Sequence, residues 1–405
     1  MISVSEKKQL HFTGVDKLFY KNMLKDLFLD TCTVKFWDGE EVVYGSGASQ
    51  FKLIFNEPIP KADVIADPAL ALGEAYMYKT VEVEGDIQKI MESLFRNFDN
   101  FISINNLGTS FIKTLSNNVR KSKKNVEHHY DIGNDFYKLW LDDTMTYSCG
   151  YFASDDDTLA QAQKNKVAHI LKKLNLKAGQ TLLDIGCGWG ELIIAAAQNY
   201  RVKATGITLS AEQFTAIEKR IKKERLENLV EVQLVDYREL KNRTFDSIVS
   251  VGMIEHVGKD HLPEYFSVIN RLLNARGLSL LHGITGKRKN KGGTNSWINK
   301  YIFPGGYIPN INELINYMIG ESFYLLDAES LRRHYGRTLE NWAGNFEQAL
   351  PEIQKSKDEV FIRMWRLYLN TCAAAFNCGN LDVHQLLFSK NLSNDVPWCR
   401  NYMYQ

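Results

Sequence analysis

Three glycines with the spacing GxGxG stand between two apolar runs in the segment LLDIGCGWGE, residues 182–191. A turn after a parallel strand is tight and a ligand must approach its backbone closely, and both demands favour residues without a β-carbon. A dinucleotide site would instead have GxGxxG and an acidic residue at the end of the next strand. That next run ends in ATGITLS, without an acid. Asp184 precedes the first glycine, where its carboxylate could hold a cationic ligand.

Three later segments place polar side chains at the ends of apolar runs. In GITLSAEQ, Ser210 is expected to cap a helix with Gln213 as its capping-box partner, while Thr208 and Gln213 could reach a ribose. In LVDYREL, Asp236 could accept from an adenine amino group, and SVGMIEHVG is expected to end the fourth strand with Glu255 and His256. Doubly wound sheets bind ligands at the carboxyl ends of their strands. The whole pattern is typical of class I methyltransferases that use S-adenosyl-L-methionine (SAM), although an isolated GxGxG turn can also be an ordinary tight turn.

The elements that must position these residues alternate between strand and helix from residue 160 onward. Short apolar runs are expected as strands at 180–184, 202–208, 230–235, 245–251 and 278–282. This rhythm predicts an α/β fold, a doubly wound, Rossmann-like catalytic domain over 128–405. Residues 1–105 predict a smaller α+β domain, with a hairpin in TVKFWDGEEVVYG, a strand in SQFKLIFN and a helix in GDIQKIMESLFRNF. Residues 106–127 form a basic linker that is either solvated or a contact for anionic lipid head groups.

Composition excludes several classes of function. The 49 basic and 48 acidic residues nearly cancel, which argues against nucleic acid as a partner. The six cysteines have no CxxC spacing, so structural zinc, or any other metal site, is not expected, and reduced thiols fit a cytoplasmic protein. No apolar run reaches the roughly 18 residues that span a bilayer, so we expect any contact with lipid to come from the water side.

The motifs together resemble the cyclopropane fatty acid synthases over roughly residues 125–400. The segments that carry the likeness are HYDIGNDFYKLWLDDTMTYSCGYF, LLDIGCGWG, GITLSAEQ, VDYREL, VSVGMIEHVG, WINKYIFPGG and LNTCAAAF. The resemblance implies transfer of a methylene group from SAM to the cis double bond of an unsaturated acyl chain in a membrane phospholipid, forming a cyclopropane ring. It also implies a homodimer associated peripherally with the inner face of the membrane, and an N-terminal domain that recruits phospholipid.

The resemblance carries over two sets of residues. The expected SAM contacts are Tyr147, Ser148, Asp184, Gly186, Cys187, Gly188, Trp189, Gly190, Thr208, Leu209, Ser210, Gln213, Asp236 and Tyr237. His129 and Tyr130 are expected in a lid over the cofactor. The second set would hold a bicarbonate that acts as the base, and it consists of Cys149, Glu255, His282, the backbone of Ile284, and Tyr335.

The chemistry makes further demands on these residues. Methyl transfer to an alkene leaves a carbocation, which aromatic faces can stabilise; Tyr147, Tyr151, Phe152 and Tyr301 are candidates. We expect a proton shared between bicarbonate and Glu255, with a raised pKa for that carboxyl group. Cys372 is expected to pack near the acyl chain rather than to react, because alkylation of an alkene by SAM needs no thiol.

Two other functions stay open from the sequence. One is a SAM-dependent methyltransferase that makes branched methyl or methylene fatty acids, which would keep the cofactor turn without the bicarbonate set. The other is a lipid-binding or carrier protein with a vestigial methyltransferase fold.

Overall fold

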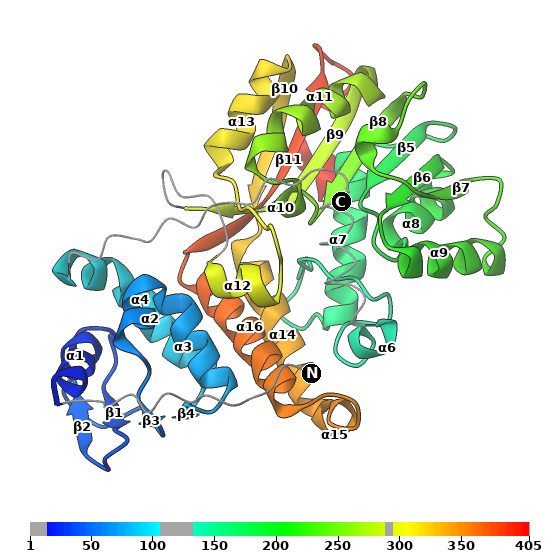
Figure 1. The fold of residues 1–405 in the computed structure, drawn as a ribbon. Helices are drawn as coiled ribbons and strands as arrows, with labels where there is room; N and C mark the ends of the chain where they lie inside the picture. Colours follow the sequence, from blue (N-terminus) through cyan, green and yellow to red (C-terminus); the bar gives the residue numbers. More distant parts are fainter. Residues whose placement is uncertain (1–13, 106–132, 288–294, 405) are drawn as a thin grey trace. The chain divides into compact units, whose positions relative to one another are not determined.

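The computed structural model describes residues 14–105, 133–287 and 295–404, and the elements are labelled in Figure 1. Residue contacts divide the chain into two compact units. The first holds residues 1–111 and 359–363, and the second holds residues 112–358 and 364–405. Among the described residues, no helix is both long enough and apolar enough to cross a membrane.

The first unit packs helices against a four-stranded sheet with the order β2-β1-β3-β4. Its elements are α1 (Gly14–Lys25), β1 (Cys32–Lys35), β2 (Glu41–Tyr44), β3 (Phe51–Phe55), α2 (Lys61–Ala66), α3 (Pro68–Met77), β4 (Val81–Glu84) and α4 (Ile87–Asn105). The predicted hairpin is confirmed: β1 and β2 are antiparallel, with Val34 opposite Val42. The expected strand is β3 and the expected helix is α4.

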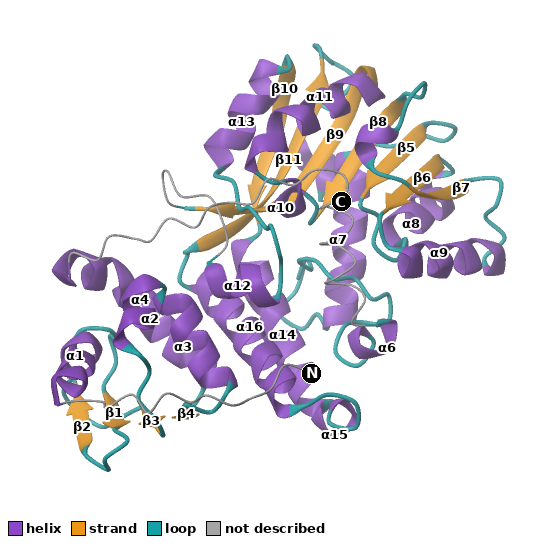
Figure 2. Ribbon diagram, in the orientation of Figure 1, coloured by secondary structure: helices purple, strands orange, loops and turns teal. Residues whose placement is uncertain are grey.

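The second unit contains a seven-stranded sheet with the order β10-β11-β9-β8-β5-β6-β7 (Figure 2). Its strands are β5 (Thr181–Ile185), β6 (Lys203–Thr208), β7 (Val230–Leu234), β8 (Phe245–Val251), β9 (Leu273–Gly286), β10 (Phe323–Ser330) and β11 (Leu381–Lys390). The five predicted strands are β5 to β9, which are parallel, and the predicted doubly wound fold is confirmed. The sequence analysis did not identify β10 and β11. β11 runs antiparallel to both of its neighbours.

Helices cover both faces of this sheet (Figure 2). One face is covered by α7 (Leu159–Lys173), α8 (Glu191–Tyr200) and α9 (Ala211–Lys223), and the other by α11 (Leu262–Leu272) and α13 (Ile311–Gly320). The other helices after α4 are α6 (Asn134–Tyr137), α10 (Ile254–Val257), α12 (Ser296–Tyr301), α14 (Arg332–Gln348), α15 (Leu350–Ile353) and α16 (Glu359–Asn377), with short 3-10 turns η1 (Tyr237–Glu239), η2 (Lys259–His261) and η3 (Arg400–Met403). Successive residues of β5 bury against opposite cores, Leu182 with the α7–α9 layer and Leu183 with the α11–α13 layer. Both faces of β5 are therefore dry, as a central parallel strand requires.

Buried ion pairs fix α7 against β10. Lys173 Nζ donates to Asp327 Oδ2 at 3.0 Å and to Glu329 Oε2 at 2.6 Å, and the Lys173 side chain is fully buried. One turn earlier, His169 Nε2 lies 2.7 Å from the same Glu329 oxygen. Because buried charges are costly unless paired, this cluster sets the position of α7 along its axis.

Candidate active site

The glycine turn has the conformation that its sequence predicts. Gly186, Gly188 and Gly190 have φ of +82°, +54° and +85°, which is the region that side chains with a β-carbon rarely adopt. A β-carbon on Gly190 would lie 3.0 Å from Ile217 of α9, so this glycine permits close helix packing. A β-carbon on Gly188 would meet nothing within 4 Å. The middle of the turn therefore faces open space.

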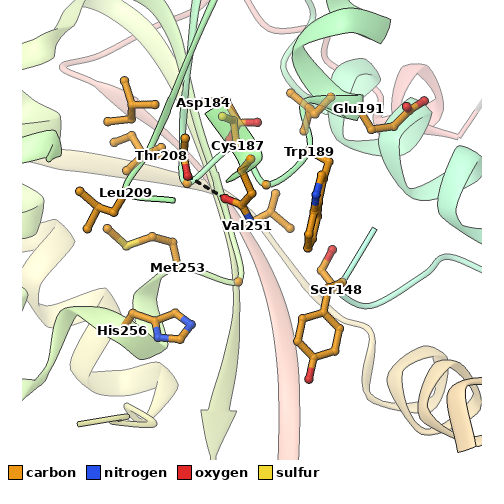
Figure 3. A pocket seen from close by; sticks show the side chains of 18 of the residues that line it. Ser148, Asp184, Cys187, Trp189, Glu191, Thr208, Leu209, Val251, Met253 and His256 are labelled. Carbon is orange, nitrogen blue, oxygen red and sulfur yellow. Dashed lines mark hydrogen bonds between the residues drawn. The ribbon is translucent and has the colours of Figure 1, made fainter. Parts of the chain in front are cut away.

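A pocket of about 1190 Å³ of empty space, open mouth included, lies at the carboxyl ends of β5 and β8. The chain runs from β5 outward to β7 and returns to β8 on the other side of β5, so this is the switch point where doubly wound folds bind ligands. Predicted SAM contacts that line it are Tyr147, Ser148, Asp184, Gly186, Cys187, Gly188, Trp189, Thr208, Leu209, Gln213, Asp236 and Tyr237. Gly190 and Ser210 do not line it. Figure 3 shows Ser148 and Trp189 on one side and Thr208 and Leu209 on the other.

Ser210 and Gln213 have structural roles in the helix cap. Ser210 is the N-cap of α9, and its hydroxyl accepts from the Gln213 backbone at 3.3 Å, as predicted. The Gln213 side chain does not complete a capping box; its Oε1 accepts from the Thr208 hydroxyl at 2.7 Å. That bond holds Thr208 and Gln213 together on the wall of the pocket, where both were expected to reach a ribose.

The Asp236 carboxylate already accepts hydrogen bonds from Arg238, which the sequence analysis did not expect. Its Oδ1 accepts from the Arg238 backbone at 3.0 Å and from Arg238 Nε at 2.8 Å, and its Oδ2 accepts from Nη2 at 2.7 Å. Since a carboxylate offers about four acceptor positions, one remains, on Oδ2. Arg238 also lines the pocket. Any adenine amino group that bonds to Asp236 would therefore do so beside a guanidinium group.

Two buried charged side chains, Asp184 and Lys166, face the same pocket. Each is 3% exposed. Burial raises the pKa of Asp184 to about 7, while the positive charge of Lys166 acts to lower it. Among the described residues, Asp184 Oδ1 has no hydrogen-bond partner. Burial lowers the pKa of Lys166 to about 8, and Lys166 Nζ donates to the Ser148 hydroxyl at 2.9 Å. The sequence analysis did not single out Lys166.

The segment that carries Tyr147 and Ser148 is held by one face of α7. Gln163 lies one turn before Lys166, and its amide donates to the carbonyls of Thr146 at 3.3 Å and Ser148 at 2.9 Å. Because α7 is itself fixed by its buried ion pairs, this side of the pocket is built on a rigid element.

Glu255 contacts Ile284 near the carboxyl end of β9, two residues after His282 on the same strand. Glu255 Oε1 accepts from the Ile284 backbone N–H at 2.5 Å, so the N–H that was expected to contact bicarbonate is already used. Glu255 Oε2 and His282 Nε2 are both buried without a partner among the described residues. Burial raises the pKa of Glu255 to about 7. The raised pKa was predicted, but its cause here is burial rather than a neighbouring anion.

A glutamine, not a carboxylate, orients His282. Gln385 lies directly across from His282 on β11, and its Nε2 is 3.2 Å from His282 Nδ1. With that amide nitrogen as donor, Nδ1 accepts and the ring proton resides on Nε2. Burial lowers the pKa of His282 to about 3, so the ring is neutral and presents an N–H donor that no group in residues 14–105, 133–287 or 295–404 accepts from. The sequence analysis missed Gln385, because glutamine in a strand carries no signal of its own.

Cys149 and Tyr335 share a contact with the backbone carbonyl of Leu331. The thiol of Cys149 lies 3.8 Å from the Leu331 carbonyl, which also accepts from the Tyr335 N–H at 3.0 Å. The Leu331 N–H donates in turn to Val383 on β11, two residues before Gln385. Burial raises the pKa of the Cys149 thiol, so it is a protonated donor.

Cys372 lies on α16, partly buried, and burial raises its pKa to about 12. A thiol with this pKa is protonated at neutral pH and is a poor nucleophile.

An aromatic cluster adjoins the pocket. The centroid of the Tyr147 ring lies 5.5 Å from that of Tyr137, 5.5 Å from that of Trp140 and 5.1 Å from that of Trp342. The hydroxyl oxygen of Tyr147 lies 2.8 Å from the hydroxyl oxygen of Tyr368. The other aromatic candidates are engaged elsewhere.

Tyr151 stacks between His169 and His334, with centroids at 4.4 and 4.8 Å. The Arg337 guanidinium lies over the Phe152 ring at 4.4 Å. Tyr301 pairs with Trp297. None of these three rings lines the pocket. His129 and Tyr130 lie outside the described residues, as does the linker at 106–127.

Comparisons with known proteins agree with this architecture. The model of the family described as "Mycolic acid cyclopropane synthetase" matches residues 117–386, and a domain of unknown function matches residues 19–106. A "Probable fatty acid methyltransferase" from Pseudomonas putida is 37% identical over 387 residues, covering 92% of this chain and 96% of that protein. The "Cyclopropane-fatty-acyl-phospholipid synthase" of Escherichia coli K12 is 39% identical over 342 residues, covering 83% of this chain and 87% of that protein.

Among solved structures, the mycolic acid cyclopropane synthase CmaA1 complexed with SAH and CTAB is similar. It has a TM-score of 0.63 and 35% identity, and the match covers 68% of this chain and 99% of that one. The chain therefore belongs to the mycolic acid cyclopropane synthetase family and is an enzyme with the class I methyltransferase fold.

Proposed function

We propose that this enzyme transfers the methyl carbon of SAM to the cis double bond of an unsaturated acyl chain in a phospholipid and closes a cyclopropane ring. The pocket at the switch point would hold the donor, with Asp184 near its charged aminoacyl end and Thr208 and Gln213 near its ribose. The similar structure that is complexed with SAH and CTAB supports this assignment, because it combines the demethylated donor with a long-chain surfactant in one relative.

The first chemical step would occur beside the aromatic cluster. The π electrons of the alkene attack the methyl carbon, the carbon–sulfur bond breaks, and its electron pair stays on sulfur as S-adenosylhomocysteine leaves. A carbocation remains on the acyl chain. Tyr147 is the ring best placed to stabilise it, since it lines the pocket and packs against further aromatic rings. Those rings also exclude water, which would otherwise capture the cation.

Ring closure requires loss of one proton from the transferred carbon, with the C–H electron pair forming the last ring bond. The observation that carries this step is that two buried atoms, Glu255 Oε2 and His282 Nε2, each have no partner among the described residues. A neutral histidine N–H and a carboxyl group with a pKa near 7 can together hold a small anion and share its proton. Bicarbonate fits this donor set, and when bound there it would supply the base. The thiol of Cys149 and the Tyr335 hydroxyl would be further donors.

The test is incubation of the purified protein with SAM and vesicles of a cis-monounsaturated phosphatidylglycerol, followed by mass spectrometry and proton NMR of the lipids. We expect the gain of one CH₂ with loss of the olefinic proton signals. An unchanged lipid would refute the proposal. Full activity in carbonate-depleted buffer would refute the bicarbonate role alone.

A branched methyl or methylene product is the second candidate, since the relative from Pseudomonas putida is described as a fatty acid methyltransferase. A methylene product would gain the same CH₂ but keep an olefinic signal, so the same spectra separate the two outcomes.

The roles of the first unit remain part of the proposal. We infer that residues 1–105 help recruit phospholipid to a cytoplasmic enzyme at the inner face of the membrane, and that the enzyme is a homodimer. The sequence LAL at residues 70–72 offers apolar side chains for a lipid contact, but Leu70, Ala71 and Leu72 are only partly exposed, and Ala71 and Leu72 pack on the core of that unit. Vesicle flotation and sedimentation equilibrium of the full chain would test the two inferences separately.

A further inference from the structure

Lys166 is a buried cation for which the proposed chemistry has no role so far. It lies on α7 with an exposure of 3% and lines the donor pocket. Its Nζ has three protons to donate, yet among the described residues it makes one hydrogen bond, to the neutral hydroxyl of Ser148 at 2.9 Å. No carboxylate of the described chain forms an ion pair with it within 4.0 Å. A buried ammonium without an anion is costly, so this position calls for a ligand that brings one.

The neighbouring lysine on the same buried side of α7 shows the alternative arrangement. Lys173 is fully buried too, but it is satisfied by two carboxylates, Asp327 and Glu329. Lys166 thus differs from Lys173 in facing a pocket without a carboxylate of the described residues in direct contact, although Asp142, Asp184 and Glu191 lie near enough to raise its pKa against the effect of burial. The pocket also holds the complementary group, because Asp184 lines it too, and Asp184 Oδ1 is buried without a hydrogen-bond partner in the part of the chain that the structure describes.

A ligand that satisfies both residues carries an anion and a cation close together. The aminoacyl end of SAM has this chemistry, with an ammonium and a carboxylate on one carbon atom. We propose that Lys166 binds the carboxylate of the methyl donor while Asp184 faces its ammonium group. This inference rests on the proposed function, since it requires SAM in the pocket. Ser148 would then link Lys166 to the ligand. Its hydroxyl oxygen accepts from Lys166, and its hydroxyl proton can be donated to the carboxylate of the donor.

The experiment measures donor binding without turnover. Isothermal titration of lipid-free protein would compare SAM with decarboxylated SAM, for the wild type and for Lys166→Met. In the wild type, loss of the carboxylate should weaken binding on the order of 10- to 100-fold, the range of a charge-assisted hydrogen bond. In Lys166→Met, the affinity for SAM should fall by a similar factor. The affinity for decarboxylated SAM should change by less than about twofold, because this ligand lacks the carboxylate that Lys166 would bind.

Controls separate this role from a structural one. Lys164→Met removes an exposed lysine from the same helix and should leave both affinities unchanged. Lys166→Gln keeps a donor for Ser148 and repeats the comparison if the methionine variant fails to fold by circular dichroism.

Three outcomes decide the matter. Equal weakening of both ligands in the Lys166 variants would overturn the proposal, and so would a wild type that binds both ligands equally. A wild type that binds neither SAM, decarboxylated SAM nor S-adenosylhomocysteine would instead refute the proposed function itself.

Discussion

Replacement of Glu255 by glutamine should make the protein more stable at high pH while abolishing ring closure. Burial raises the pKa of Glu255 to about 7, from the ordinary value of 4.5. Because the folded state holds this proton more tightly than the unfolded state, the carboxyl group's contribution to stability is fully present below pH 4.5. It is lost as the pH rises through 7. Glutamine keeps an acceptor for the Ile284 N–H and never ionises.

The size of the effect follows from the two pKa values. A displacement from 4.5 to about 7 corresponds to about 3 kcal/mol at pH well above 7, at roughly 1.4 kcal/mol per unit. Between pH 5 and pH 8, the stability of the glutamine variant relative to the wild type should therefore rise by roughly 2 to 3 kcal/mol. For a domain of this size that is roughly 5 °C in the midpoint of thermal unfolding.

The assay is differential scanning calorimetry of both proteins at several pH values, without donor or lipid. Taking the difference between the two proteins cancels every titrating group that they share. Glu212→Gln, at an exposed position on α9, controls for loss of one surface carboxylate. A difference in midpoint that stays flat from pH 5 to pH 8 would refute the assignment of a buried, proton-holding carboxyl. Ring formation by Glu255→Gln should fall by on the order of 100-fold or more, as for loss of a general acid–base group.

Three further predictions test other parts of the site. Gln385→Leu should leave His282 Nδ1 without its donor, so that both ring tautomers of His282 are populated in nitrogen-correlated NMR spectra. The rate of cyclopropane formation should fall by on the order of 10-fold. An unchanged tautomer pattern would count against the role of Gln385. Cys372→Ser should keep near wild-type activity, since a thiol with a pKa of about 12 stays protonated; loss of activity with an intact fold would indicate a chemical role. Gly190→Ala should lower the unfolding free energy by about 1–3 kcal/mol, because φ is +85° and the new β-carbon would lie 3.0 Å from Ile217; an undiminished midpoint in denaturant would contradict this.

The parallel core of the catalytic unit could be predicted from the sequence because its signals are local. Each of the strands β5 to β8 is a short apolar run that ends in a ligand-facing turn, and the glycine turn after β5 has the positive φ angles that its composition predicts. The strand β11 gave no such signal. It pairs with β9, about 100 residues earlier in the chain, and a strand is recognised from its partner as much as from its own residues.

The candidate site divides in the same way. Residues in motifs, such as Asp184 and Thr208, line the pocket as expected, whereas Lys166 was hidden by its residue type. Lysines are almost never fully buried, so the KNK stretch of α7 resembles a solvated face, yet Lys164 is exposed and Lys166 is buried. Likewise, the bidentate pairing of Arg238 with Asp236 is a choice of rotamers that no spacing rule anticipates.

The position of β11 bears on how the enzyme is made. This strand is inserted between β9 and β10, although both are translated long before it. A nascent chain that stops short of Leu381 therefore has two unpaired strand edges in the interior of its largest sheet, and such edges invite association with other chains. It also has His282 without Gln385, the side chain that orients its ring. Translation of residues 381–390 closes the sheet and orients the histidine in a single event, and premature products should be inactive, aggregation-prone species rather than partly working enzymes.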